Sequence, residues 1–324
     1  MALRAVPALT ESRYFVFGHG YSAGHFVATL DPKSVEGVTV RTRDKASHLA
    51  AHGLKPFVFD GEHPTDGIAS ALYRATHLLI SVPPGHEAPA GAHVGGANAR
   101  PGDPVLRWYE NEIAHGSPNL QWIGYLSTVG VYGDHDGGWV DETAEVRPVS
   151  ARSRERVAAE DAWQKAAATR GVPLAILRLS GIYGPGRNGF VNLASGTARR
   201  LVKPGQVFNR IHVDDIAGAL QLLAERRLGG IFNVTDDEPA PPQDVIAYAA
   251  DIADIAAPPE TPFDTAVLSP MARSFYGENK RVSNARLKAA GYVFRYPTYR
   301  EGLAGLTADA DRARAAAGLP VPQA

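Results

Sequence analysis

The chain has 324 residues, of which 44% are hydrophobic, with no cysteine and a formal net charge of −1. This length is enough for one large α/β domain or two smaller ones with a substantial core, and the near-neutral charge argues against a general binder of nucleic acid or anionic membranes. The absence of cysteine excludes disulfides, thiolate catalysis and cysteine-ligated metals.

The first predicted elements are a strand, a glycine turn and the start of a helix, within residues 14–27. Gly18 permits a tight turn after the apolar run, Gly20 lets backbone approach a pyrophosphate, and Ala23 is the third small residue, where helix packs on strand. The pyrophosphate is expected at the helix N-terminus, where N–H groups are unpaired. This pattern is typical of a dinucleotide-binding fingerprint, and a purely structural glycine turn is the alternative.

The second strand, predicted to extend over residues 37–43, indicates which nucleotide is bound. An NAD-preferring fold has an acid about 20 residues past the glycines, where it holds the ribose 2′-hydroxyl. This chain instead has Arg41, Thr42 and Arg43, and two cations with a hydroxyl suit a 2′-phosphate. NADP is therefore the predicted cofactor, with NAD as the alternative. The alternative interpretation is that the two arginines are ordinary solvated residues at the end of a strand.

Further apolar runs alternate with helical patterns, which implies crossover units and a parallel sheet covered on both faces. Strands are predicted at residues 14–18, 38–42, 56–60, 77–82, 121–127 and 174–179. Helices are predicted at 46–51, 67–74, 104–115 and 152–168. The loop between Pro83 and Pro104 leaves the carboxyl end of the fourth strand, where such sheets bind ligands. The expected fold class is α/β, a Rossmann-type doubly wound parallel sheet with a smaller C-terminal substrate lobe.

After about residue 180 the pattern becomes mixed. The predicted elements there are a turn at 181–187, helices at 213–225, 242–255 and 300–317, and a strand at 231–234. The predicted domains are a dinucleotide-binding Rossmann domain over residues 1–180 and a mixed α/β substrate-binding lobe over residues 181–324, with some segments returning to the main sheet.

Several motifs occur in the order found in a known family. Residues 18–23, 126–133, 177–186 and 210–215 read GHGYSA, LSTVGVYG, LRLSGIYGPG and RIHVDD, and residues 279–284 and 296–303 read NKRVSN and YPTYREGL. With these motifs the chain resembles the extended short-chain dehydrogenase/reductases of the NAD-dependent epimerase/dehydratase group, and within it an atypical subgroup. The resemblance implies an NAD(P)-dependent oxidoreductase or epimerase/dehydratase-like enzyme that acts on a small carbonyl, hydroxyl or nucleotide-sugar compound.

The family usually has a serine or threonine that polarises a carbonyl, a tyrosine acid/base and a lysine four residues after it. Thr128 occupies the family's Ser/Thr position, and an ordinary strand-end hydroxyl is the alternative. In place of the tyrosine and lysine, alignment from Glu160 gives Arg152 and Arg156. Arg156 retains the ability to hydrogen-bond a ribose, whereas a guanidinium stays protonated and Arg152 is no ordinary proton donor. The alternative interpretation is that these arginines form a solvated face of the helix.

Another group must then move the proton if the reaction occurs. The candidates are Tyr132, Tyr183 and His212, with Asp134 and Asp141 in the loop after the fifth strand. Each of the first three also has a structural interpretation: Tyr132 as a wall residue, Tyr183 as a packing residue at the turn, and His212 as a hydrogen-bonded structural histidine.

The predicted site residues fall into three groups. The catalytic group is Thr128, Tyr132 and Arg156. The cofactor-binding group is Gly18, Gly20, Tyr21, Ser22, Ala23, Arg41, Thr42, Arg43, Asp60, Val82, Ser127 and Arg156, with Asp60 either contacting the adenine edge or serving as a turn residue. The substrate-binding group is Tyr183, Arg187, Asn188 and His212. No metal is predicted, because the histidine pairs His48/His52 and His86/His93 lack acidic companions.

The missing tyrosine leaves a second function open, a non-catalytic NADP(H)-binding redox sensor or scaffold protein. A small-molecule substrate is the expected partner, with no nucleic acid and no membrane, and a homodimer through the helix at 104–115 is possible. Residues 1–13 lack a signal-peptide core and no later segment approaches a membrane span, so a cytoplasmic location is the default expectation.

Overall fold

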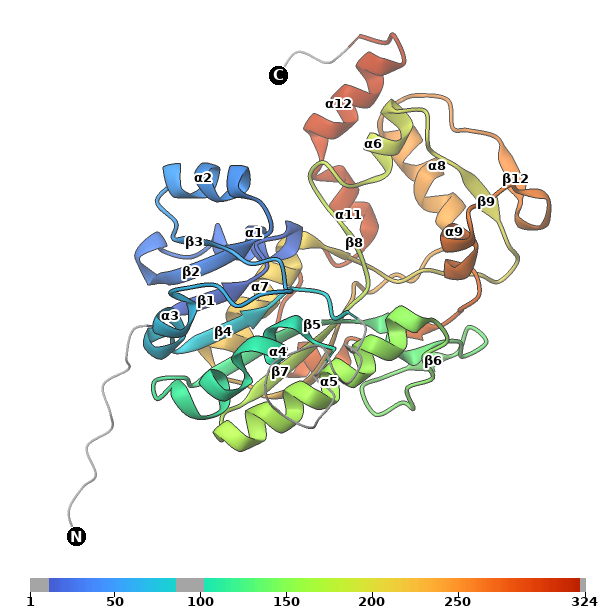
Figure 1. Ribbon diagram of the computed structural model, residues 1–324. Coiled ribbons are helices and arrows are strands. Elements are labelled where there is room, and N and C mark those ends of the chain that lie inside the picture. Colours follow the sequence, from blue (N-terminus) through green and yellow to red (C-terminus); the bar gives the residue numbers. More distant parts are fainter. Residues whose placement is uncertain (1–11, 86–101, 321–324) are drawn as a thin grey trace. The chain divides into compact units, whose positions relative to one another are not determined.

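The computed structural model describes residues 12–85 and 102–320. Its main sheet has seven strands in the order β11-β7-β5-β4-β1-β2-β3 (Figure 1). The strands are β1 (Tyr14–Phe17), β2 (Val35–Val40), β3 (Pro56–Val58), β4 (His77–Ile80), β5 (Trp122–Thr128), β7 (Leu174–Leu179) and β11 (Gly230–Val234). Strand β1 runs parallel to β2 and β4, and β2–β3 and β4–β5 are parallel too. Helices alternate with these strands, which confirms the α/β Rossmann-type fold.

Among the residues described, six helices lie along the chain between strands of this sheet and have at least seven residues: α1 (Tyr21–Val27), α2 (Arg43–Ala51), α3 (Ile68–Arg74), α4 (Pro104–Asn111), α5 (Ala151–Arg170) and α7 (Val213–Glu225). A 3-10 turn (Val129–Tyr132) follows β5, and a π-helical turn (Glu112–Gly116) continues α4. The remaining elements are β6 (Trp139–Val140), β8 (Gly181–Tyr183), α6 (Gly189–Ala194), β9 (Arg200–Val202), β10 (Arg210–His212), α8 (Pro242–Ile252), β12 (Glu260–Pro262), α9 (Pro270–Phe275), β13 (Arg281–Val282), α10 (Ala285–Ala289), α11 (Tyr299–Ala304) and α12 (Thr307–Ala316).

The chain divides into two compact units, each discontinuous in sequence. Unit 1 consists of residues 1–126, 158–176 and 220–230, and unit 2 of residues 127–157, 177–219 and 231–324. The two-domain division at residue 180 stays a prediction, since it concerns which segments bind cofactor and which bind substrate.

Unit 1 has an aromatic core around its first strand. All four residues of β1 are buried, as expected for a strand covered on both faces. The ring of Phe17 contacts the rings of Phe59 and Tyr109 at centroid distances of 5.9 and 5.6 Å, and Phe15 contacts Phe57 at 5.8 Å. Such offset and edge-on ring pairs stabilise a core beyond the area they bury. The strand that precedes the glycine turn is therefore rigidly held.

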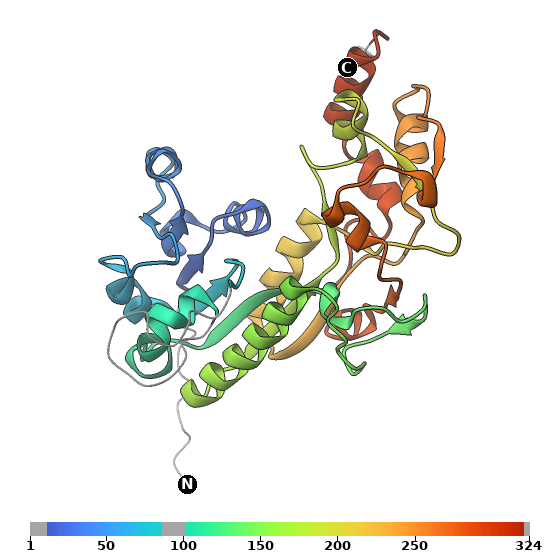
Figure 2. The same cartoon turned by 45° about the vertical axis from the view of Figure 1, so that its right-hand side comes forward.

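Unit 2 contains three two-stranded pieces and a group of packed helices. Strand β8 pairs with β10, β9 with β12, and β6 with β13, all in parallel register. Helices α6, α8 and α12 lie side by side in both views (Figures 1 and 2). Their shared core includes Tyr183, Phe190, Ala249, Tyr299 and Ala313.

The predicted bounds at the junction of β2 and α2 differ from the structure. The predicted strand over 37–43 ends at Val40, and the helix predicted from residue 46 begins at Arg43. Thr42 is the N-cap of this helix, because its Oγ1 accepts a hydrogen bond from the Lys45 N–H at 3.4 Å. The capping threonine is the signal that moves Arg43 from the strand to the first helical turn.

The C-terminal helix predicted over 300–317 is two helices, α11 and α12. The break falls at Gly305 and Leu306, where the Gly305 N–H still reaches Glu301 O (3.0 Å) and Leu306 leaves helical geometry with φ −99° and ψ 48°. Leu306 is only 8% exposed and belongs to the core of unit 2. Burial of this side chain, with glycine's low helix propensity, explains the interruption. Likewise, the predicted turn at 181–187 begins with a strand, β8, because the Gly181 N–H bonds to Asn209 O.

No helix in residues 12–85 and 102–320 is both long enough and apolar enough to span a membrane.

Candidate functional site

The glycine turn after β1 has the geometry that its sequence predicts. Gly18 has a φ of +89°, and a Cβ added to it would lie 3.0 Å from the carbonyl carbon of Ser81 and from Val82 Cγ2. Any other residue at Gly18 therefore meets both backbone strain and a steric clash. Gly20, the N-cap of α1, has a φ of −89°, and an added Cβ would meet nothing within 4 Å. The space beside Gly20 is open, as the approach of a pyrophosphate requires.

The other predicted contacts of this turn lie on α1. Ser22 and Ala23 are buried, whereas Tyr21 is partly exposed and its ring contacts the His25 ring in a tilted arrangement at a centroid distance of 4.9 Å. Ala23 thus has the predicted packing role.

His19, in the middle of the turn, was missed by the sequence reasoning. Its ring lies against Gly24, where an added Cβ would be 3.2 Å from His19 Cε1. Its Nδ1 is buried and has no hydrogen-bond partner among the described residues. Burial and the nearby Lys45 ammonium lower the pKa of His19, so the imidazole is neutral near pH 7.

The arginines after β2, Arg41 and Arg43, are exposed, and their side chains have no hydrogen-bond acceptor among the described residues. Within the described parts of the chain, no carboxylate or carbonyl accepts a hydrogen bond from the side chain of Arg41 or Arg43. Other cations of unit 1 do have such partners, for example Arg74, which donates from Nε to Glu36 at 2.9 Å. The open space at Gly20, the unpartnered His19 Nδ1 and two free guanidinium groups fit a phosphorylated dinucleotide.

Asp60 and Val82 complete the predicted contacts of unit 1. Asp60 Oδ1 accepts hydrogen bonds from the backbone N–H groups of Glu62 (2.8 Å) and His63 (3.2 Å), and the first of these is the main cause of its lowered pKa. This geometry favours the turn-residue interpretation of Asp60. Val82 lies over the glycine turn, with Cγ2 at 3.0 Å from the Cβ position of Gly18.

In unit 2, Thr128 has the features of a polarising hydroxyl. It is the last residue of β5 and the N-cap of the 3-10 turn, and its Oγ1 accepts a hydrogen bond from the Gly130 N–H at 3.1 Å. Its hydroxyl hydrogen has no acceptor among the described residues, so it is available to a ligand. Ser153, a residue missed by sequence reasoning, flanks the same turn, with Oγ 3.5 Å from the Cβ position of Gly130 and 2.8 Å from Ser150 Oγ.

The arginines at the family's tyrosine and lysine positions differ in exposure. Arg152 is exposed on the first turn of α5, whereas Arg156, one turn further on, is partly buried. Ser127, beside Thr128, is buried. The structure therefore keeps Arg156 as the better candidate for a positioning role.

Tyr132 lies in the core of unit 2. Its ring is fully buried, its hydroxyl donates to Asn233 Oδ1 at 2.8 Å, and the Arg178 guanidinium lies 4.8 Å from the ring centroid. Burial raises the pKa of Tyr132 above its usual value. These contacts favour the wall-residue interpretation over a role as acid or base.

The four predicted substrate residues have structural partners. Asn188 caps α6 through Oδ1, and its Nδ2 donates to Gly184 O (2.9 Å) and Asp309 Oδ2 (2.6 Å). His212 is 1% exposed between the rings of Tyr183 and Tyr296, and its Nδ1 accepts the Asp214 N–H at 3.2 Å. Arg187 is exposed at the turn after β8. Of the four, Tyr183 lines the cavity described next.

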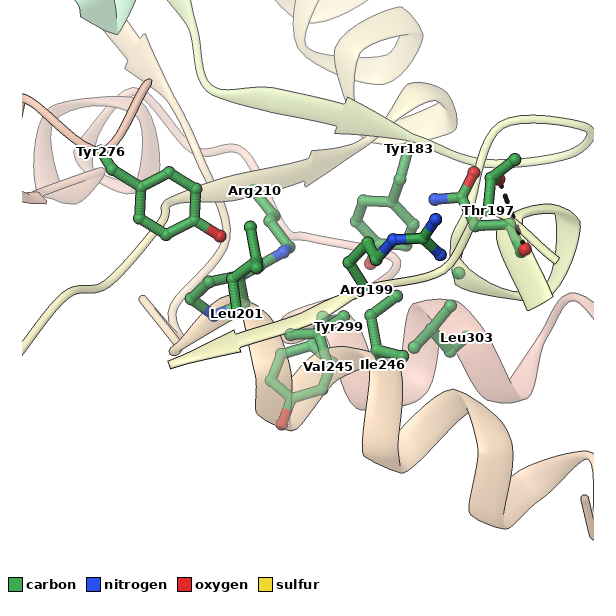
Figure 3. Close-up of a pocket in the computed structure, with 13 residues that line it drawn as sticks. Tyr183, Thr197, Arg199, Leu201, Arg210, Val245, Ile246, Tyr276, Tyr299 and Leu303 are labelled. Carbon is green, nitrogen blue, oxygen red and sulfur yellow. Dashed lines mark hydrogen bonds between the residues drawn. The ribbon is translucent and has the colours of Figure 1, made fainter. Parts of the chain in front are cut away.

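That cavity lies within unit 2 and has a volume of about 360 Å³. Its lining comes from β8, α6, β9, β10, α8 and α11 and consists of Tyr183, Gly189, Asn192, Thr197, Arg199, Leu201, Arg210, Pro242, Val245, Ile246, Tyr276, Tyr299 and Leu303. Figure 3 shows Arg199 and Arg210 among the rings of Tyr183, Tyr276 and Tyr299. Sequence reasoning found only Tyr183 of this set. The described residues contain no group of three or more His, Asp or Glu side chains able to hold a metal ion.

Comparison with curated proteins finds a partial relative. The chain is 32% identical over 166 residues to the protein YeeZ of Escherichia coli strain K12, a match that covers 51% of this chain and 54% of YeeZ. The chain therefore matches about half the length of this relative.

Solved structures match over a greater length. A functionally unknown conserved protein from Silicibacter pomeroyi is 46% identical, with a TM-score of 0.77 over 93% of this chain and 99% of that one. A structure from Methylobacillus flagellatus, described as a candidate NAD-dependent epimerase/dehydratase, is 26% identical, with a TM-score of 0.65 over 92% and 98%. The model of the NAD dependent epimerase/dehydratase family matches residues 117–235. Over these residues the chain is similar to the NAD-dependent epimerase/dehydratase family, and the solved structures share its fold along most of its length.

Proposed function

We propose that the protein is an NADP-preferring oxidoreductase or epimerase/dehydratase-like enzyme acting on a small carbonyl, hydroxyl or nucleotide-sugar compound. The observation that carries the cofactor preference is the pair Arg41 and Arg43, which stand after β2 without a described acidic partner where an NAD-binding chain has an acid. The match of residues 117–235 to the NAD dependent epimerase/dehydratase family supports a nicotinamide cofactor.

Different residues of unit 1 would contact different parts of this cofactor. Gly18 fixes the turn, Gly20 leaves room for the pyrophosphate, and the guanidinium groups of Arg41 and Arg43 pair with the 2′-phosphate. The Thr42 hydroxyl already caps α2, and it retains its hydrogen for donation to the same phosphate. A bound nicotinamide cofactor supplies or accepts the hydride.

Thr128 is the proposed polarising residue of unit 2. Because the Gly130 N–H holds Thr128 Oγ1 from one side, the hydroxyl hydrogen is directed to an acceptor elsewhere, and a substrate oxygen fits that role. Arg156 is the proposed positioning residue for the cofactor ribose, since its guanidinium donates hydrogen bonds at any pH.

The alternative function, a non-catalytic NADP(H) sensor or scaffold, has one observation in its favour. Neither Arg152 nor the buried Tyr132 is suited to donate a proton, and the Tyr183 hydroxyl, which donates to Thr298 O at 3.4 Å, has a pKa raised by burial and by Asp236. The enzyme interpretation therefore relies on a substrate or solvent proton relayed through hydroxyl groups such as those of Thr128 and Ser153.

The cofactor proposal is tested by fluorescence titration with NADPH and NADH in parallel. We expect NADPH to bind at least tenfold more tightly, and Arg41→Ala or Arg43→Ala to reduce this preference. Lys33→Ala, which removes an exposed cation elsewhere on unit 1, is the matched control and leaves the preference unchanged. Equal binding of the two cofactors by the native protein would overturn the NADP proposal.

Turnover distinguishes the enzyme from the sensor. Steady NADPH oxidation with a panel of aldehydes and ketones, reduced about a hundredfold or more by Thr128→Ala and partly restored by Thr128→Ser, supports the enzyme. NADPH binding with no oxidation and no epimerised product across the panel supports the sensor.

A further inference from the structure

The cavity of unit 2 combines apolar walls with two arginines. Leu201, Val245, Ile246 and Leu303 supply aliphatic surface, and three tyrosines supply aromatic rings. The only amide or aliphatic hydroxyl side chains in the lining belong to Asn192 and Thr197. Such a lining favours a ligand that combines an apolar body with a polar end.

Arg210 carries a positive charge that the described residues do not neutralise. Its Nη1 donates to two backbone carbonyls, Phe208 O at 2.9 Å and Ala240 O at 3.1 Å, and no described carboxylate lies within 4.0 Å. Its other nitrogens have no acceptor among the described residues. A partly buried guanidinium in this state gains from an anion brought by a ligand.

The acid nearest to this charge does not supply that anion. Asp236 is 1% exposed, its Oδ1 accepts the Glu238 N–H at 3.2 Å, and its Oδ2 is buried with no described partner. Burial raises the pKa of Asp236 to about 8, despite the opposing effect of Arg210. Asp236 is therefore largely protonated near pH 7 and leaves Arg210 unbalanced.

Arg199 provides the second cation, in an exposed position. Its Nη1 donates to Gly196 O (3.3 Å) and Ala198 O (3.0 Å), and no described carboxylate pairs with it. Backbone contacts thus hold one nitrogen of each arginine, while the remaining nitrogens are available to a planar anion.

We propose that this cavity binds a small organic acid, with its carboxylate on Arg210 and Arg199 and its aromatic or branched apolar body against Leu201, Val245 and the tyrosine rings. The proposal rests on the proposed function, because it names the class to which the substrate belongs.

A nucleoside diphosphate fits the cavity less well. A base needs a donor and an acceptor for its polar edge, and apart from the tyrosine hydroxyls only Asn192 and Thr197 offer neutral side chains of that kind in the lining. The volume of about 360 Å³ is near the lower end of ligand pockets, which are roughly 300–1,000 Å³. A one-ring acid fills such a cavity, whereas a nucleotide sugar extends well beyond it.

The test is isothermal titration calorimetry of the full-length protein, without cofactor, using four probes. The probes are trans-cinnamate, its neutral methyl ester, uridine diphosphate and inorganic phosphate. We expect cinnamate to bind, the ester to bind at least tenfold more weakly, and inorganic phosphate to show no comparable binding. Tighter binding of uridine diphosphate, equal binding of the ester, comparable binding of phosphate, or no binding of cinnamate would each overturn the proposal.

Variants locate the binding in this cavity. Arg199→Ala and Arg210→Lys are each expected to weaken cinnamate about tenfold, whereas Arg147→Ala, which removes an exposed cation paired with Glu145 at 3.0 Å, has no effect. Arg199 is exposed, so Arg199→Ala tests the proposal even if Arg210→Lys does not fold. Binding unaffected by Arg199→Ala contradicts the proposal.

The two proposals fail separately. A protein that binds NADPH but not cinnamate retains the proposed function and loses the organic-acid site. A protein that binds cinnamate but neither nicotinamide cofactor loses the proposed function, and the cavity is then a ligand site without redox chemistry.

Discussion

Two buried carboxyl groups, Glu36 in unit 1 and Asp236 in unit 2, have different surroundings. In unit 1, Glu36 is 4% exposed and accepts hydrogen bonds from Arg13 (2.8 Å) and Arg74 (2.9 Å). In unit 2, Asp236 is equally buried but forms no ion pair with a described residue, and Arg210 instead donates to carbonyl groups beside the cavity.

The charge of Glu36 thus contributes to folding, whereas the charge of Arg210 is available to a ligand. In unit 1, the carboxylate of Glu36 is paired within the unit. Arg41 and Arg43 lie on the surface, where salt screens their attraction for a phosphate. Unit 2 leaves a partly buried guanidinium without a counter-charge, where an anion is less screened. The two proposed sites should therefore respond differently to mutation, pH and salt.

The largest expected loss of stability comes from removing the carboxylate of unit 1. Glu36→Gln leaves three cations around a buried amide, and we expect the free energy of unfolding to fall by about 2–3 kcal/mol, less than for a fully buried pair because Arg13, Arg74 and Lys55 are about half exposed. Urea unfolding measures this loss. Glu260→Gln, which breaks an exposed pair with Arg200 in unit 2, should cost less than about 1 kcal/mol.

The same variant gives a pH test. Burial alone raises the pKa of Glu36, but the hydrogen bond from Arg74 and the charges of Lys55 and Arg13 hold it below its usual value. A carboxyl with a lowered folded-state pKa contributes stability above its unfolded pKa, and this stability is lost as the pH falls through the folded value. The stability advantage of the native protein over Glu36→Gln should thus shrink as the pH falls below about 4.3, the usual glutamate value. A constant difference down to pH 3 would contradict the ion-pair account.

The next effect separates ligand binding from folding in unit 1. Gly20→Ala places a methyl group in open space, so we expect a loss of stability of about 1 kcal/mol from the poorer N-cap, yet at least tenfold weaker NADPH binding. Gly53→Ala is the control, because Gly53 has a φ of +81° with equally open surroundings. It should cost about 1 kcal/mol through backbone strain and leave the affinity unchanged. NADPH binding that tracks stability in both variants would argue against a cofactor at Gly20.

An effect of opposite pH dependence is expected in unit 2. Burial raises the pKa of Asp236 from its usual value near 3.8 to about 8, so the folded state holds a proton that the unfolded state releases, and stability falls as pH rises between these values. Asp236→Asn removes that dependence. We expect the variant to gain stability relative to the native protein as the pH rises from 5 to 8, by up to about 1.4 kcal/mol per pH unit, measured by chemical unfolding. Asp254→Asn, at an exposed carboxylate held by Arg314, should show no such change.

Local sequence patterns were sufficient for several elements of the fold. The bounds of β7 and α7 agree with the predicted ranges, and the turn at Gly18 has the required positive φ. Each of these features is encoded by consecutive residues: an apolar run, a 3.6-residue repeat, or a glycine between strand and helix.

The candidate substrate site was harder to predict, for two physical reasons. Arg199 directly precedes β9, and Arg210 is the first residue of β10. The tertiary fold brings both to one cavity, so no spacing in the sequence links them. The residue type also does not reveal whether a side chain is buried. Tyr132, Asn188 and His212 carry polar groups, yet in the fold these groups form hydrogen bonds with Asn233, Asp309 and the backbone of Asp214. The predicted helix at 104–115 is partly a π-helical turn, and His86 and His93 lie outside the described residues.

The central claim is that Arg41 and Arg43 recognise a 2′-phosphate, and calorimetric titration with adenosine 2′,5′-bisphosphate and adenosine 5′-monophosphate tests it most directly. We predict that the bisphosphate binds at least tenfold more tightly at 50 mM salt, that this advantage shrinks at 500 mM salt, and that the Arg41→Ala/Arg43→Ala double variant abolishes it. Equal affinity for the two nucleotides, or an advantage that survives in the double variant, would contradict the account.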